Sequence, residues 1–121
     1  MKTLCFDIDG TICTQTPSEY HRAEPFQEAR EVINKLYDEG FQIIFFTSRF
    51  MGRTNGDVKK AHEEGYEFTK KQLDEWGFRY HELIMGKPSH HISVDDKSLF
   101  FQSNWELIYQ AIKEKAREDI H

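Results

Sequence analysis

The run at residues 41–46, FQIIFF, constrains the fold more than any other segment of this chain. It is nearly continuous in β-branched and aromatic side chains, and the polar residues Thr47, Ser48 and Arg49 follow it. Strands that are buried on both faces have this pattern, and they are typical of parallel sheets in α/β proteins. We therefore expect a parallel sheet with residues 41–46 as one of its inner strands.

Strand-like and helix-like segments alternate along the chain. The patterns predict strands at residues 2–6, 41–46, 80–85 and 91–94, and helices at residues 25–39, 57–76 and 104–117. Pro25 suits a first helical position, Asp57 and Asn104 suit N-caps, and Gly77 suits a helix end, while Gly65 suggests a break in the second helix. The alternation predicts one domain over residues 1–121, a Rossmann-like parallel sheet with helices on both faces.

The composition is that of a soluble globular protein, with 38% hydrophobic and 31% charged residues. No apolar run approaches the roughly 18 residues of a membrane span, and the N-terminus lacks a signal-peptide pattern. Cys5 and Cys13 have no metal or disulfide spacing, which indicates reduced thiols in a cytoplasmic protein. The net charge of −5 argues against nucleic acid or an anionic membrane as a partner.

A polar cluster follows each predicted strand. In chain order the clusters are Asp7 with Asp9, then Thr47, Ser48 and Arg49, then Lys87, and finally Asp95 with Asp96. The carboxyl ends of parallel strands lie at one edge of a sheet, where open α/β sheets bind their ligands. We therefore expect the four clusters to meet in one crevice.

The side chains in these clusters suit a phosphate ester and a hard cation. Asp7, Asp9 and Asp95 offer the oxygen ligands that Mg²⁺ prefers. Lys87 is a point charge for an anionic oxygen, and Thr47 can donate a hydroxyl hydrogen bond to a phosphoryl oxygen.

A charge count suggests how Asp9 would act. Three carboxylates and a phosphate dianion carry more charge than one divalent cation and Lys87 can balance. Protonation of Asp9 and the proximity of Arg49 would restore the balance, so we expect Asp9 to be a general acid.

These residues resemble the motifs of the haloacid dehalogenase (HAD) superfamily. Residues 7–11, DIDGT, resemble the first motif, residues 45–47, FFT, the second, Lys87 the third, and residues 92–96, ISVDD, the fourth. All four occur in the family's order. The resemblance implies a Mg²⁺-dependent phosphatase in which Asp7 forms an aspartyl-phosphate and Asp9 protonates the leaving group and then activates water. It also implies that Asp7, the backbone carbonyl of Asp9, and Asp95 hold the metal, with Asp96 bound directly or supporting a ligand.

The gaps between the motifs are too short for an inserted cap domain, so the chain is similar to the capless branch. Residues 47–57 and 86–88 resemble small phosphatases of bacterial capsule and surface-polysaccharide synthesis. This implies a sugar or polyol phosphate as substrate. We expect residues 14–24, residues 49–56 or a second subunit to cover the site. The candidate substrate-binding residues are Gly10, Ser48, Arg49, Arg53 and Asn55.

Two alternatives use the same scaffold. A phosphorylatable receiver domain is similar in size, but it has its phosphoacceptor Asp in mid-chain, where this sequence has Thr47. A phosphotransferase would pass the phosphoryl group from Asp7 to an alcohol, and the sequence leaves this open. His90 and His91 are adjacent, so in a strand they would point to opposite faces, which argues against a shared metal.

Overall fold

The computed structural model describes residues 2–88, 92 and 94–118 of the 121-residue chain. The three predicted α-helices are present, and so are the first three predicted strands. The elements in chain order are β1 Thr3–Phe6, the 3-10 helix η1 Tyr20–Arg22, α1 Gln27–Asp38, β2 Gln42–Thr47, α2 Val58–Trp76, β3 Glu82–Met85 and α3 Trp105–Glu118.

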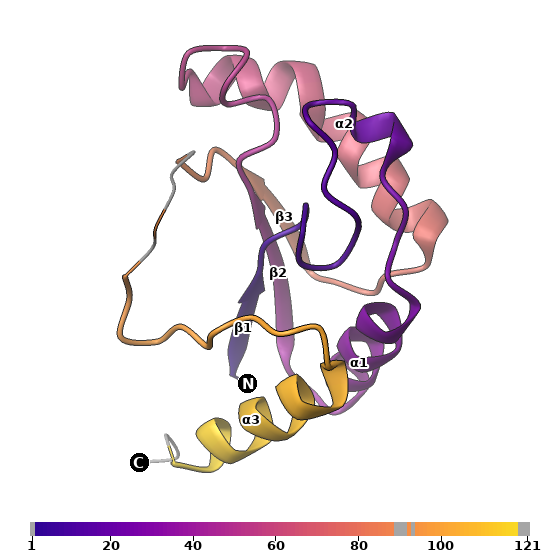
Figure 1. The fold of residues 1–121 in the computed structure, drawn as a ribbon, viewed down its shortest axis with the longest axis vertical. Helices are drawn as coiled ribbons and strands as arrows, with labels where there is room; N and C mark the ends of the chain where they lie inside the picture. The colour runs from indigo at the N-terminus through magenta and orange to yellow at the C-terminus, as the bar shows by residue number, and fades with distance from the viewer. Residues whose placement is uncertain (1, 89–91, 93, 119–121) are drawn as a thin grey trace.

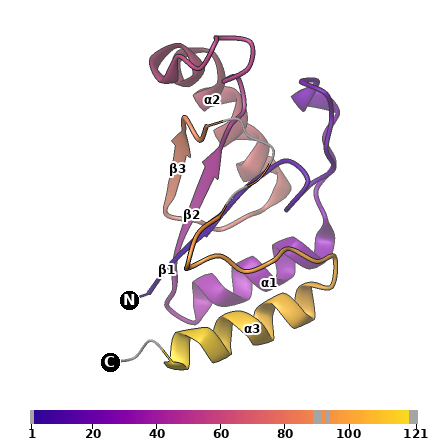
Figure 2. The same cartoon turned by 60° about the vertical axis from the view of Figure 1, so that its left-hand side comes forward.

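The strands form a parallel sheet in the order β1-β2-β3. Phe6 pairs with Phe45, and Thr47 pairs with Met85, so the three carboxyl ends lie at one edge. Right-handed crossovers between neighbours in this order place α1 and α2 on the same side of the sheet, as Figure 1 and Figure 2 show. The predicted α/β class and parallel sheet are confirmed.

The core fills the space between the sheet and these helices. Ile43, Phe45 and Thr47 on one face of β2 are buried, whereas Ile44 and Phe46 on the other face are only half-buried. The expectation of equal burial on both faces of β2 is therefore wrong, because α1 and α2 lie on a single side. Helix α3 lies beside α1, and the ring of its Trp105 is 6.0 Å from that of Phe6 on β1.

Helix α2 is bounded as predicted. The Asp57 side chain accepts a hydrogen bond from the Lys60 backbone N–H, and Gly77 adopts φ = 82° just past the end. The predicted break at Gly65 is wrong, because the helix is continuous. A Cβ at Gly65 would collide with the ring of Phe50, so this glycine makes room for the loop after β2.

The fourth strand, predicted at residues 91–94, is not found in the described residues. Ile92 and Val94 belong to no strand and are 83% and 96% exposed. His91 and Ser93 lie outside the described residues, as does His90. Among the described helices, none is long and apolar enough to cross a membrane.

Candidate active site

Three of the four predicted clusters meet at the carboxyl edge of the sheet. Asp7 follows β1 directly, and its Oδ1 is 3.6 Å from Nζ of Lys87, which follows β3. The Lys87 backbone N–H donates to the Thr47 carbonyl at the end of β2, with an N–O distance of 3.0 Å. The parallel pairing thus brings together residues about 80 positions apart in sequence, as the order of the strands predicted.

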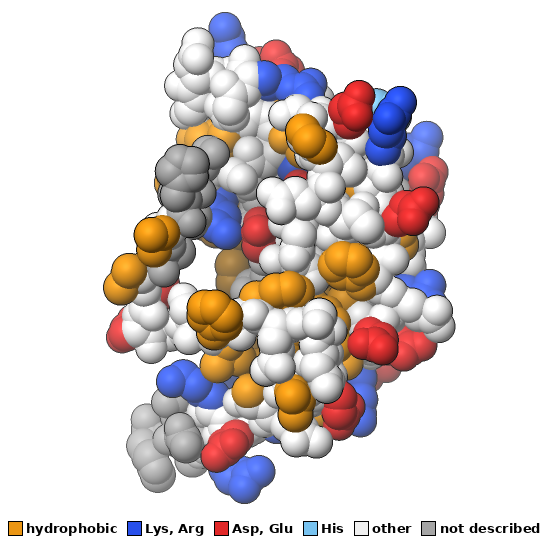
Figure 3. Space-filling model, viewed as in Figure 1, with side chains coloured by type: hydrophobic (Ala, Val, Ile, Leu, Met, Phe, Trp, Pro, Cys, Tyr) orange, Lys and Arg blue, Asp and Glu red, His pale blue; other side chains and the backbone are white. Residues whose placement is uncertain are grey.

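Asp7 and Lys87 line a cavity of about 850 Å³ between the open face of the sheet and the segment that leads to α3. Figure 3 shows the hollow, with an acidic and a basic side chain at its rim. Partial burial raises the pKa of Asp7, and the Lys87 ammonium opposes that rise. Asp7 is therefore a carboxylate that a ligand can reach, with a cation beside it.

Asp9 lies two residues further on but has a different partner. Its Oδ2 accepts from Nε of Arg49 at 2.8 Å, and its Oδ1 accepts from Nη2 at 2.9 Å. The Arg49 side chain has no exposed surface, and that of Asp9 is 18% exposed. A two-point pair of this kind fixes the orientation of the carboxylate, and removal of one buried partner typically costs about 3–5 kcal/mol.

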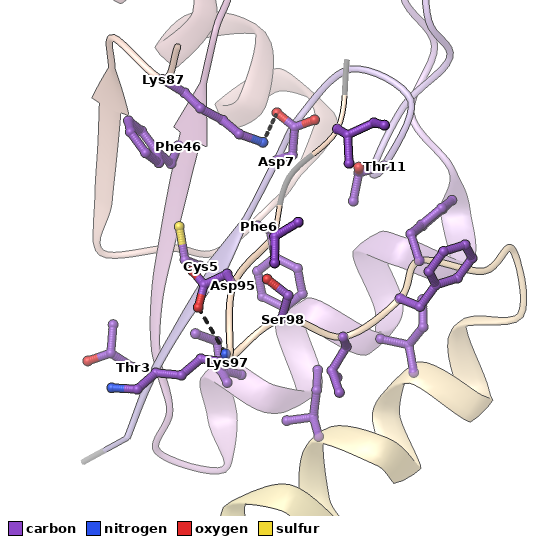
Figure 4. A pocket seen from close by; sticks show the side chains of 18 of the residues that line it. Thr3, Cys5, Phe6, Asp7, Thr11, Phe46, Lys87, Asp95, Lys97 and Ser98 are labelled. Carbon is purple, nitrogen blue, oxygen red and sulfur yellow. Dashed lines mark hydrogen bonds and ion pairs between the residues drawn. The ribbon is translucent and has the colours of Figure 1, made fainter. Parts of the chain in front are cut away.

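The two cysteines have thiols held in the protonated form. Burial, and then the charge of Asp9, raises the pKa of Cys13 to about 12. Burial also raises the pKa of Cys5, which lines the cavity below Asp7 (Figure 4). Thiolates are the form that soft metals and redox chemistry require, so the two thiols act as core or wall residues.

Thr47 and Ser48 hold the backbone that follows β2. Thr47 is only 1% exposed, and its Oγ1 accepts from the Arg49 backbone N–H at 3.0 Å. The Ser48 carbonyl accepts from the Met51 backbone N–H at 3.0 Å. The hydroxyl hydrogen of Thr47 is not used in this bond. Because Thr47 is buried, a phosphoryl group could reach that hydrogen only if the surrounding loop moved.

The remaining predicted substrate contacts have mixed outcomes. Gly10 adopts φ = 79° in the turn after Asp9 and lines a different hollow from Asp7. Arg53 donates to the Ser18 carbonyl at 2.8 Å and lies over the ring of Phe50. Asn55 is exposed and adopts φ = 54°.

The predicted acidic ligands are not assembled into one metal site. Asp95 lines the same cavity as Asp7, but Figure 4 draws it apart from the Asp7–Lys87 pair. A hydrogen bond from the Lys97 backbone N–H, and then one from Asp96, lowers the pKa of Asp95. Among the residues that the structure describes, no three His, Cys, Asp or Glu side chains group as metal ligands.

The donor chemistry nevertheless suits a hard cation. Asp7 and Asp95 are oxygen donors on one cavity, and the neighbouring Cys5 thiol is protonated. The carboxylate of Asp9 is bound to Arg49. Asp7 and Asp95 are therefore donors of the type that a hard cation needs, although they are not brought together, and Asp9 could offer its backbone carbonyl, as the family resemblance implies.

Two partners of Arg49 were not found from the sequence. Gln72 on α2 accepts from Nη1 of Arg49 at 2.5 Å and donates to the Tyr20 carbonyl at 2.8 Å. The Arg49 guanidinium also lies 4.7 Å from the centre of the Tyr20 ring. Tyr20 belongs to residues 14–24, which the sequence placed near the site, but no pattern distinguished Gln72 from other polar helix residues.

Comparisons with known proteins bear on the fold. No protein-family model and no curated protein matches the sequence. A crystal structure of a protein from Vibrio cholerae is similar at a TM-score of 0.76 and 24% identity, over 93% of this chain and 99% of that one. A chain of the Pnkp1/Rnl/Hen1 RNA repair complex is similar at a TM-score of 0.51 and 17% identity, over 99% of this chain and 32% of that one.

A third solved structure is D,D-heptose 1.7-bisphosphate phosphatase from B. bronchiseptica with magnesium and phosphate. Its TM-score is 0.49 at 13% identity, over 97% of this chain and 64% of that one. Together with the sheet order, the likeness to the Vibrio cholerae protein shows that the chain has a Rossmann-like α/β fold. Because likeness at this level concerns the fold, the activity has to be argued from the site.

Proposed function

We propose that this protein is a phosphatase that hydrolyses a small phosphate monoester through an aspartyl-phosphate on Asp7. The observation that carries the proposal is the Asp7 carboxylate on the cavity wall at the carboxyl end of β1, 3.6 Å from the Lys87 ammonium. The motif resemblance of residues 7–11, 45–47 and 92–96 points to the same chemistry.

In the first step, a carboxylate oxygen of Asp7 attacks the phosphorus, and the bond from phosphorus to the leaving oxygen breaks. Asp9 gives its proton to that oxygen, which leaves as an alcohol. Lys87 lies close enough to Asp7 to contact the phosphoryl oxygens during the transfer. In the second step, water attacks the phosphorus, Asp9 takes the proton of the water, and phosphate leaves Asp7.

The pairing of Asp9 with Arg49 bears on the second step. Both Asp9 oxygens accept hydrogen bonds from Arg49, so the pair sets the position of the carboxylate that would take a proton from water. For the first step Asp9 has to carry a proton, as the charge count suggested.

Mg²⁺ is the cofactor that we propose, held by Asp7 and Asp95 with the Asp9 carbonyl. When bound, it would supply positive charge next to the phosphoryl oxygens. The substrate class that we propose is a sugar or polyol phosphate of capsule or surface-polysaccharide synthesis. This finer assignment depends on the resemblance of residues 47–57 and 86–88.

The test is phosphate release from an aryl phosphate and from a panel of sugar and polyol phosphates. We expect turnover with Mg²⁺, loss in EDTA, and poor rescue by Ca²⁺, whose looser coordination does not suit in-line transfer. No release from any ester with Mg²⁺ would contradict the phosphatase proposal. Undiminished turnover in EDTA would contradict the metal, and transfer to an added alcohol in place of water would indicate a phosphotransferase.

A further inference from the structure

We propose that Arg49 is a positioning residue, which fixes the Asp9 carboxylate and links it to helix α2 and the segment around Tyr20. The inference depends on the proposed function, because it assigns a role within that reaction. The sequence suggested that Arg49 binds substrate. Its side chain has no exposed surface, and its Nε, Nη1 and Nη2 donate to Asp9 and Gln72.

Arg49 and Asp9 form a two-point pair. Arg49 donates through Nε and Nη2 to the two separate oxygens of Asp9, so the planar guanidinium sets both the position and the plane of the carboxylate. A lysine offers a single flexible ammonium and cannot set that plane. Asp9 follows the end of β1 by three residues and lies outside the strand, so the sheet alone does not fix its side chain.

Arg49 is itself held by contacts with Thr47, Gln72 and Tyr20. Its backbone N–H donates to Thr47 Oγ1, and its Nη1 donates to Gln72 Oε1 on α2. Gln72 passes the connection on, because its Nε2 donates to the Tyr20 carbonyl. The Tyr20 ring lies against the Arg49 guanidinium, and its hydroxyl accepts from the Phe50 backbone N–H at 3.3 Å.

These contacts join four parts of the chain around one guanidinium. The end of β2, helix α2, the turn that carries Asp9 and the segment around Tyr20 cannot move independently while Arg49 is in place. Proton transfer needs Asp9 within hydrogen-bond reach of the leaving oxygen, and small misplacements of a catalytic group can cost about 100-fold in rate. Arg49 would therefore act on turnover through Asp9, without touching the substrate.

The experiment measures kcat and KM of Arg49→Lys on two esters, p-nitrophenyl phosphate and glycerol phosphate. The aryl leaving group needs little protonation, whereas the alkyl leaving group depends on Asp9. We expect kcat to fall about 10- to 100-fold further for the alkyl ester than for the aryl ester, with little change in either KM. A substrate-binding role would raise KM, and a merely structural role would lower both rates equally, so either result would overturn the inference.

A second test variant and a matched control accompany Arg49→Lys. Gln72→Leu removes the acceptor of Arg49 Nη1 without altering Asp9, and we expect a smaller split in the same direction. It also decides the question if Arg49→Lys does not fold, since an unchanged alkyl-to-aryl ratio would overturn the inference. The matched control is Arg79→Lys in the exposed Arg79–Asp38 pair, with a nitrogen–oxygen distance of 2.7 Å, where we expect the wild-type ratio.

A double-mutant cycle separates this inference from the proposed function. In the Asp9→Asn background, Arg49→Lys should no longer change the alkyl-to-aryl ratio, because its effect passes through Asp9. A full additional split in that background would overturn the positioning role while leaving the phosphatase intact. Absence of turnover by the wild-type protein would instead overturn the proposed function, and this inference with it.

Discussion

The two acidic residues after β1 lie in contrasting surroundings. Both carboxylate oxygens of Asp9 accept hydrogen bonds from a buried guanidinium. Helix α2 and the segment around Tyr20 hold that guanidinium in place. Asp7 faces a wide cavity and has one flexible cation beside it, while Asp95 lies further along the same wall. We call the surroundings of Asp9 and Arg49 the closed region, because they fix a group that must transfer a proton at a defined position. We call the cavity with Asp7 and Asp95 the open region, because it leaves space for the ester and a cation.

Removal of the Asp7 carboxylate should have the largest effect on the open region. Asp7→Asn should lower turnover by several orders of magnitude, because the nucleophile is lost. The free energy of unfolding of Asp7→Asn at neutral pH should not be lower than that of the wild type. Burial raises the pKa of Asp7 in the folded state, so the ionised form is penalised, and the Asp7 contribution to stability decreases as pH rises through the raised pKa.

Asparagine has no such titration. The melting temperature of Asp7→Asn should therefore equal or exceed that of the wild type above the raised pKa, with a smaller advantage at more acidic pH. A lower melting temperature at neutral pH would mean that the carboxylate is structural.

A smaller effect is expected where the closed region packs against α2. In Gly65→Ala the new Cβ would collide with the Phe50 ring, next to Arg49 in sequence. Phe50 already has φ = 68°, so it has little freedom to move aside. Overpacking of this kind costs about 1–3 kcal/mol, partly offset by the roughly 1 kcal/mol better helix propensity of alanine.

Urea unfolding measures this difference. The control is Gly52→Ala in the loop that carries Phe50, where a Cβ has no neighbour within 4 Å and stability should be unchanged. Equal stability of the two variants would show that the loop after β2 is not held by its contact with Gly65.

The smallest effect is expected at the rim between the two regions. Arg53 joins the loop to the Ser18 carbonyl, whereas Asn55 has an exposed side chain. Arg53→Ala should loosen the loop from the Ser18 segment and lower kcat/KM for any ester by a few-fold, since exposed contacts of this kind contribute about 1 kcal/mol or less. Asn55→Ala should affect only a hydroxyl-rich ester. If Asn55→Ala also lost turnover of the aryl phosphate, Asn55 would not act by contacting hydroxyl groups of the substrate.

The sequence predicted the parts of this molecule that local patterns determine. The period of the apolar residues, the Asp57 cap and the Gly77 end are local, and each is found as expected. The reason for Gly65 is a contact with Phe50 from another part of the chain, so the glycine was misread as a helix break. Val94 is a β-branched residue of the kind common in strands, but it is 96% exposed. A strand forms only where a partner strand is available, and the local sequence does not show that.

The candidate site shows the same division. Strand order was enough to bring Asp7, Thr47 and Lys87 to one edge. The direction of the Arg49 side chain depends on partners 40 residues before it and 23 residues after it, which no local pattern reveals. A charged residue next to a motif was therefore expected to bind substrate, and its pairing with Asp9 was not foreseen.

The central claim is that Asp7 carries the phosphoryl group during turnover, and trapping that group tests it most directly. The protein is mixed with p-nitrophenyl phosphate and Mg²⁺, quenched in acid within one turnover, and digested for peptide mapping. We predict a phosphate on the peptide that contains Asp7, stable in acid and released by hydroxylamine, as an acyl phosphate should be, and absent from Asp7→Asn. Turnover of the ester with no such phosphate, or with the phosphate on another residue, would contradict the account.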